Sequence, residues 1–158
     1  MAILSFLYLI VDDMFFAAIP AIGFALIFRT PPSALKYVAL IAAIGHCTRT
    51  ILMHFGISGL ESGTFIASIC VGFMGVYWSQ HKLAHPKVIT VAGVIPMIPG
   101  IYAYKTMIAI VQINSVGFTP DLWTMMVENL VKTLFLVGAL AIGLSMPGLL
   151  FYRGKPVI

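Results

Sequence analysis

Long apolar stretches alternate with short polar joints along the whole chain. The apolar stretches cover about residues 3–28, 35–55, 64–78, 88–113 and 124–152. A helix needs about 20 apolar residues to cross the hydrocarbon core of a bilayer, and all but the third stretch reach that length. The pattern therefore predicts an all-α integral membrane protein, with about five transmembrane helices in a single transmembrane domain over residues 1–158.

The fourth stretch contains a Pro-x-x-Pro-Gly segment, in which Pro96, Pro99 and Gly100 follow nine helical residues that begin at Val88. Those nine residues would rise about 14 Å, so the break falls near the middle of the ~30 Å hydrocarbon core. Pro99 has no N–H and its ring clashes with the preceding turn, which frees backbone groups that lipid cannot satisfy. Secondary transporters commonly build their binding sites at broken helices of this depth. Pro96, Pro99 and Gly100 are therefore candidates for the lining of a transport pathway.

The basic residues near the ends of the stretches predict the orientation in the membrane. They follow the first stretch, flank the joint before the fourth and follow the fifth: Arg29 and Lys36, Lys82 and Lys87, Arg153 and Lys155. The other joints and the N-terminus carry no Lys or Arg. Because basic residues collect in cytoplasmic loops, we expect the N-terminus outside and the C-terminus in the cytoplasm.

The composition narrows the classes of function. The chain is 61% hydrophobic and only 9% charged, whereas a soluble domain carries about 25% charged residues. The net charge of +4 sits at membrane edges, so no nucleic-acid partner is expected and the lipid bilayer is the surrounding partner. No nucleophile elbow or nucleotide-binding glycine motif is present, so we predict neither an enzyme nor a cofactor. His81 and His85 have metal-ligand spacing, but no acidic or cysteine ligand lies nearby and no metal site is predicted.

Arg49 is a charge that falls inside a predicted transmembrane helix. Such a charge costs at least about 2.5 kcal/mol on insertion scales, so it needs a partner or a path to water. His46 precedes Arg49 by three residues and shares its helix face. One hypothesis is an anion site in which the guanidinium of Arg49 binds a carboxylate through two parallel N–H···O hydrogen bonds. The alternative is a structural ion pair with an acid on another helix.

Further charged residues that fall inside the predicted apolar stretches include Asp12, Asp13, Lys105 and Lys132. Asp12 and Asp13 interrupt the first stretch, and Asp13 lies about 22 Å from the cytoplasmic edge. One of this pair could face Arg49 or carry a coupling proton, as His46 also could; alternatively, both mark the outer end of a tilted, shorter helix. Lys105 is either a second carboxylate contact or a lysine that extends to the outer interface. Lys132 follows Glu128 by four residues, which favours a local ion pair.

Four segments carry a resemblance to a known family: PAIGFALIF, IGHCTRTILM, HPKVITVAGVIPMIPG and GALAIGLSMPGLLFYR. In order and in similar spacing, they resemble the small, YjjB-type subunit of the threonine/serine exporter superfamily. The resemblance implies a multi-pass protein of the bacterial inner membrane that works with a larger, homologous YjjP-type subunit. It implies succinate, or threonine and serine, as exported solutes.

The combined expectation is a membrane subunit of a secondary transporter for small carboxylates or hydroxy amino acids. The candidate pathway residues are Asp13, His46, Arg49, Pro96, Pro99, Gly100 and Lys105. Two alternatives stay open. The chain could be a non-conducting structural or assembly subunit of such a complex, or it could form a homo-oligomeric channel for small solutes.

Overall fold

The computed structural model describes residues 2–82 and 86–151, and their side chains over 4–78 and 89–150. The elements are α1 (Ala2–Ile27), α2 (Pro32–His54), α3 (Leu60–Lys82), α4 (Pro86–Val94), the 3₁₀ turn η1 (Ile95–Met97), α5 (Gly100–Val116) and α6 (Pro120–Phe151). Four helices are long and apolar enough to cross a membrane, and a fifth crossing results if α4, η1 and α5 form one broken span. The predicted all-α, multi-pass fold is confirmed.

The helix bounds extend beyond some of the expected stretches. The third helix runs from Leu60 to Lys82, about four residues longer at each end, and the last begins at Pro120, about four residues earlier than the apolar pattern indicates. Pro120 fits this place because the first helical position needs no N–H partner, and Pro32 begins α2 in the same way. For Lys82 and Lys87 only the backbone is described, and His85, Arg153 and Lys155 of the expected basic edge lie outside the described residues.

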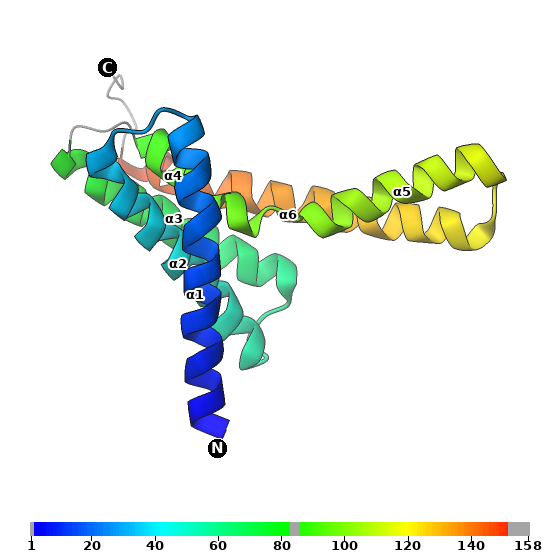
Figure 1. Cartoon of the computed structure of the whole chain (residues 1–158), viewed down its shortest axis with the longest axis horizontal. Coiled ribbons are helices and arrows are strands. Elements are labelled where there is room, and N and C mark those ends of the chain that lie inside the picture. The colour runs from blue at the N-terminus through cyan, green and yellow to red at the C-terminus, as the bar shows by residue number, and fades with distance from the viewer. Residues whose placement is uncertain (1, 83–85, 152–158) are drawn as a thin grey trace.

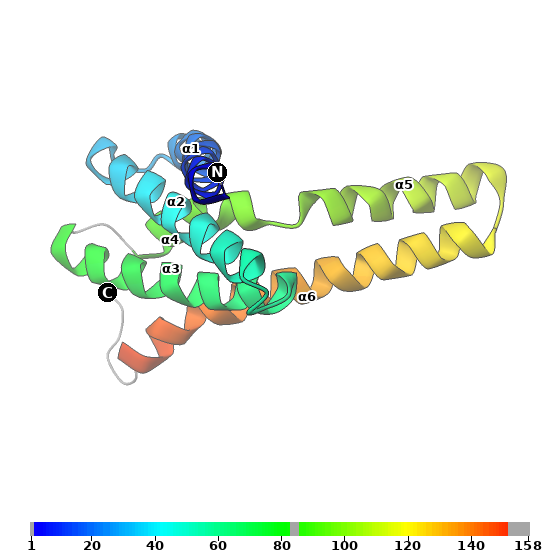
Figure 2. The same cartoon turned by 90° about the horizontal axis from the view of Figure 1, so that it is seen from below.

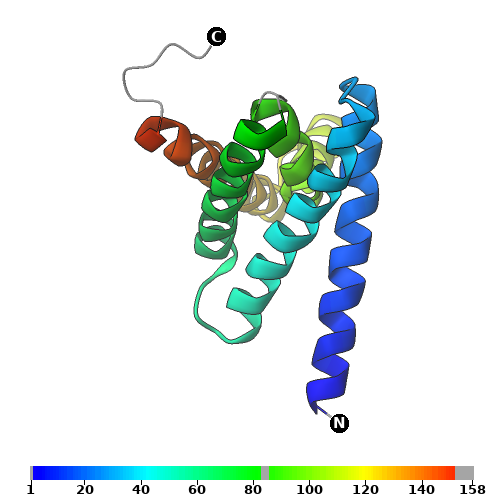
Figure 3. The ribbon, with the colours of Figure 1, turned by 90° about the vertical axis from the view of Figure 1, so that its left-hand side faces the viewer.

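The helices form a bundle from which a long hairpin projects (Figures 1 and 2). The bundle contains α1 to α4 and the C-terminal part of α6, and Figure 3 shows α1, α2 and α3 side by side. The hairpin consists of α5 and the N-terminal part of α6, which lie antiparallel and run across the direction of α1 (Figure 1). As a result α5 packs mainly against α6, while the broken end of α5 stays at the bundle.

The hairpin leaves the bundle at the predicted break. Two segments, Ile89–Met97 and Gly100–Val116, meet there at an angle of 60°. Ile98 is extended, with φ −63° and ψ 134°, because a residue before proline avoids the helical region. A hydrogen bond from the N–H of Ile98 to the carbonyl of Ile95 (3.0 Å) closes η1, and one from Ala103 to Pro99 (3.1 Å) begins α5. The expected break at the Pro-x-x-Pro-Gly segment is therefore confirmed, and the 3₁₀ turn η1 lies on its N-terminal side.

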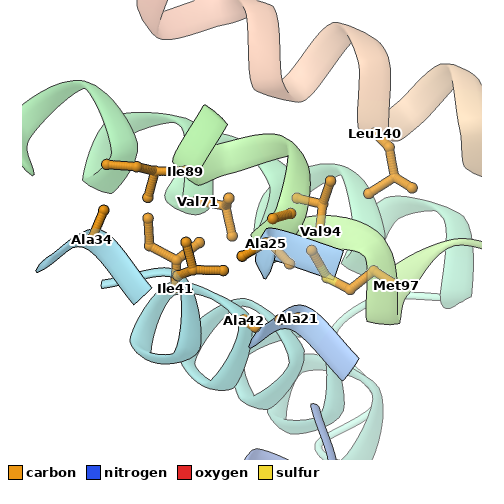
Figure 4. Packing of buried hydrophobic residues seen from close by; sticks show 13 residues of the cluster. Ala21, Ala25, Ala34, Ile41, Ala42, Val71, Ile89, Val94, Met97 and Leu140 are labelled. Atoms are coloured by element: carbon orange, nitrogen blue, oxygen red, sulfur yellow. The ribbon is translucent and has the colours of Figure 1, made fainter. Parts of the chain in front are cut away.

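The buried core lies where α2 meets α1, α3 and α4 (Figure 4). Many of its members are alanines, which allow helix backbones to approach closely: Ala21, Ala25, Ala34, Ala42, Ala67 and Ala92. Ile41, Val71, Ile89 and Met97 fill the space between them. Most large apolar side chains of α1 and of the hairpin face outwards, as expected for helices that contact lipid or another membrane segment.

Candidate functional site

A cavity of about 330 Å³ lies beside the helix break. Its polar wall comes from His46 and Arg49 of α2, and its other walls come from the break, the first turn of α5 and two leucines: Pro96, Met97, Ile98, Pro99, Gly100, Ile101, Tyr102, Leu60 and Leu136. This volume is at the lower end of the range for small-molecule sites, about 300–1,000 Å³. The cavity therefore has room for a small solute and some water.

Four polar groups in and behind the cavity wall form one connected chain. Nδ1 of His46 lies 2.7 Å from Oδ1 of Asp13, and the two side chains are 19% and 21% exposed. The hydroxyl of Thr50 donates a 2.7 Å hydrogen bond to the other oxygen, Oδ2, of Asp13. On the cavity side, Nε2 of His46 contacts Nη2 of Arg49. Asp13 on α1 is thus connected to Arg49 on α2 through His46.

Arg49 also contacts the broken helix directly. Its Nη1 donates a hydrogen bond of 3.3 Å to the carbonyl oxygen of Met97, in η1. A continuous helix would use that carbonyl for its own next turn, but Ile98 and Pro99 interrupt the ladder. The break therefore supplies a free acceptor to Arg49, which explains how a guanidinium is held at this depth.

The contact with Arg49 indicates which ring nitrogen of a neutral His46 carries the proton. A guanidinium nitrogen only donates, so Nε2 of His46 must act as an acceptor through its lone pair. The proton of a neutral ring then sits on Nδ1, facing Asp13; this assignment is inferred from the partners. Nδ1 has no aligned hydrogen-bond partner among the described residues, so its 2.7 Å approach to Asp13 is an ion pair only when both ring nitrogens of His46 carry a proton.

The first turn of α5 faces the same cavity, through Gly100, Ile101 and Tyr102. The first N–H groups of a helix have no partner within the helix, and the helix dipole adds partial positive charge there. Helix starts of this kind attract anions. The N–H of Gly100 already donates to the carbonyl of Ile98 (2.8 Å), so the charged group of the cavity wall is Arg49, and the dipole of α5 adds partial positive charge beside it.

The structure brings most of the predicted site residues together. His46, Arg49, Pro96, Pro99 and Gly100 line the cavity, and Asp13 lies directly behind His46. Of the two aspartates, Asp12 is exposed and only Asp13 faces α2. Lys105 is exposed on α5 and is not among the residues that line the cavity.

Three contributors were absent from the sequence prediction: Thr50, Tyr102 and the carbonyl of Met97. Thr50 follows His46 by four residues, so helical spacing could have placed it on the same face. Tyr102 follows Pro99 by three residues, which puts it in the first turn after the break. Lys132 also differs from expectation, because its Nζ lies 5.6 Å from the ring centre of Tyr102. No ion pair between Lys132 and Glu128 occurs in the described part of the chain.

Comparison with known protein families matches residues 13–150 to the threonine/serine exporter family, ThrE. The chain belongs to this family. The family consists of membrane exporters rather than enzymes, which agrees with a multi-pass membrane fold. A similar protein from Haemophilus influenzae, described only as uncharacterized, is 52% identical over 153 residues, which are 97% of this chain and 51% of that protein. The chain thus spans about half the length of this curated relative. No solved structure matches the chain.

Proposed function

We propose that this chain supplies the carboxylate-binding site of an exporter for small solutes, either succinate-like dicarboxylates or the hydroxy amino acids threonine and serine. The observation that carries the proposal is the guanidinium of Arg49, which lines a cavity at a helix break. Both present partners of Arg49 are neutral acceptors, a backbone carbonyl and an imidazole nitrogen. A carboxylate would be a stronger partner, because its hydrogen bonds are charge-assisted and can engage both arms of the fork.

The proposal includes a second membrane segment. The Haemophilus relative is about twice as long as the part that this chain matches, which supports a further segment that works with this one. We expect that segment to be the larger, homologous YjjP-type subunit. The exposed hairpin of α5 and α6 gives it a surface next to the cavity, since Gly100 to Tyr102 belong to both.

The proposed setting is the bacterial inner membrane, with the N-terminus outside and the C-terminus in the cytoplasm. The arrangement of the helix ends supports this orientation. The turn between α1 and α2, with the exposed Arg29 and Lys36, lies at the same end of the bundle as the end of α3 and the start of α4 (Figures 1 and 3). The start of α1 and the turn between α2 and α3 lie at the opposite end. Basic residues would then face the cytoplasm.

The decisive variant is Arg49→Ala, assayed for export of succinate and threonine from cells that also produce the larger subunit. Hydrogen bonds to a charged group contribute about 1.5–3 kcal/mol, so affinity should fall by about 10- to 150-fold. Arg49→Lys keeps the charge but not the fork, so it should recover only part of the loss. Lys36→Ala, an exposed cation near the start of the same helix, is the matched control. Full export by Arg49→Ala, at normal membrane levels, would remove Arg49 from the mechanism.

One observation favours a second candidate, a structural subunit without a pathway of its own. Arg49 already has protein partners in Met97 and His46, as a purely structural charge would. In that case Arg49→Ala should lower the amount of assembled complex rather than the export per complex. A homo-oligomeric channel makes a different prediction, namely solute flux through liposomes that contain this chain alone.

A further inference from the structure

We propose that Lys132 on α6 determines the specificity of the cavity by binding a second carboxylate of the solute, so that the site prefers dicarboxylates to hydroxy amino acids. The inference rests on the proposed carboxylate site at Arg49 and chooses between the two classes of solute named for it. It follows from the position of Lys132 beside the cavity, from the weakness of its present contact and from the chemistry of the solutes.

Lys132 lies beside one wall of the cavity. Its Nζ is 5.6 Å from the ring centre of Tyr102, and Tyr102 lines the cavity from the first turn of α5. Leu136 follows Lys132 by four residues on α6, is 2% exposed and also lines the cavity. Because residues four apart share a helix face, Lys132 is on the face of α6 that reaches the cavity one turn later. The cavity thus has Arg49 in its wall and a second cation next to it.

The present contact of Lys132 compensates its charge poorly. Lys132 falls inside a helix that is apolar enough to cross a membrane, where a cation needs a partner or a path to water. Among the residues that the structure describes, no carboxylate lies within ion-pair distance of its ammonium, including that of Glu128 one turn earlier. The face of an aromatic ring attracts a cation less strongly than a carboxylate does. A carboxylate bound next to Tyr102 would therefore be the better partner.

The side chain of Lys132 has the freedom to reach such a ligand. Lysine carries a compact ammonium with three donors on a flexible four-carbon stem, and Lys132 is exposed rather than enclosed by packing. Rotation about the bonds of the stem can bring the ammonium from the ring of Tyr102 to a carboxylate held against that residue, while α5 and α6 stay in place.

Arg49 can bind the first carboxylate without giving up its present contacts. A guanidinium has five N–H donors. His46 and the carbonyl of Met97 occupy one each. Since Arg49 lines the cavity, other N–H groups remain for a carboxylate there. The two cations can therefore act on one solute at the same time, each on a different end of it.

The two classes of solute differ in what they offer to Lys132. Three C–C bonds link the carboxylate carbons of succinate, so in its extended form the outermost oxygens are about 6 Å apart. One succinate can then contact both Arg49 and the Tyr102 wall of the cavity. Threonine or serine, bound through its carboxylate at Arg49, has no second anion for Lys132. Its ammonium adds a like charge near both cations, which is unfavourable.

The test compares succinate with succinamate, its half-amide, which has nearly the same shape but a neutral amide in place of one carboxylate. Calorimetric titration is done at about pH 7.5, where both carboxylates of succinate are ionised, on the complex purified through this chain and held in lipid nanodiscs. We expect the wild type to bind succinate about 5- to 30-fold more tightly than succinamate, as for one added contact between charged groups. Threonine should also bind more weakly than succinate.

Two variants assign this preference to Lys132. Lys132→Met keeps an apolar stem but removes the ammonium, so it should bind succinate and succinamate about equally. Lys36→Met is the matched control, because Lys36 also lies over a tyrosine ring, 5.3 Å from the ring centre of Tyr37, and neither residue lines the cavity. It should keep the full preference. Lys132→Glu reverses the charge, so it should favour succinamate over succinate, and it decides the matter if Lys132→Met does not assemble.

The outcomes separate this inference from the proposed function. If the wild type binds succinate no better than succinamate, or binds threonine more tightly than succinate, the inference is overturned and the carboxylate site at Arg49 still stands. A full preference for succinate in either Lys132 variant overturns the assignment to Lys132. If the wild type binds none of the three solutes, the proposed function fails and the inference fails with it.

Discussion

Replacing Gly45 by alanine should disturb the site through packing alone. Gly45 is buried on α2, immediately before His46. A Cβ atom there would lie 2.5 Å from Cγ2 of Val71 on α3 and 3.3 Å from Cε of Met97 in η1. Carbon atoms pack best at about 3.5–4.0 Å, so both neighbours would have to move. Val71 is fully buried and Met97 is 1% exposed, so neither can turn away into open space.

The expected cost follows from two opposing effects. Inserting a methyl group into a filled core typically costs about 1–3 kcal/mol. Replacing glycine by alanine inside a helix returns about 1 kcal/mol. Gly45→Ala should therefore lose up to about 2 kcal/mol, whereas Gly23→Ala on α1, where a Cβ meets nothing within 4 Å, should be slightly stabilised. Because the carbonyl of Met97 accepts from Arg49, a shift of η1 should also weaken carboxylate binding.

The assay combines thermal unfolding in detergent with succinate titration. The double variant Gly45→Ala with Val71→Ala removes the closest contact, so it should recover stability relative to the sum of the single changes, by a coupling of about 1–2 kcal/mol. The reasoning fails if Gly45→Ala unfolds at the same temperature as Gly23→Ala and binds succinate like the wild type. That result would mean that α3 and η1 are not tightly packed against α2.

Two further predictions concern the pathway and the orientation. Gly100→Leu should stop export while the chain folds and assembles normally, because a Cβ at Gly100 meets nothing within 4 Å and the larger side chain enters the cavity; loss of assembly, measured by co-purification of the larger subunit, would instead favour the structural role. An impermeant thiol reagent applied to intact cells should label Gly59→Cys, at the exposed turn between α2 and α3, but not Arg29→Cys between α1 and α2. The reverse labelling pattern would invert the proposed orientation.

The helix break was predictable from the sequence because its causes are local. Pro96 and Pro99 remove donors and restrict their neighbours wherever they occur, so their spacing alone places the break. The sequence also predicts that Asp13, His46 and Arg49 lie at similar depth in the membrane, because the rise per helical residue converts a position along the chain into a depth. Which aspartate faces α2 was not predictable in this way: adjacent residues point about 100° apart, and only the packing of α1 selects Asp13.

Depth counted along the chain loses its meaning beyond the break, and Lys105 shows why. Five residues after Gly100, a straight helix would place its cation outward from the cavity in the layer of Arg49. The 60° bend instead carries α5 away from the bundle, and Lys105 ends exposed on the hairpin. Tyr102, in the first turn, is still close enough to line the cavity. The displacement caused by the bend grows with distance from it. Residues within one turn of the break therefore contribute to the cavity, whereas residues further along α5 lie on the surface against which a second membrane segment would pack.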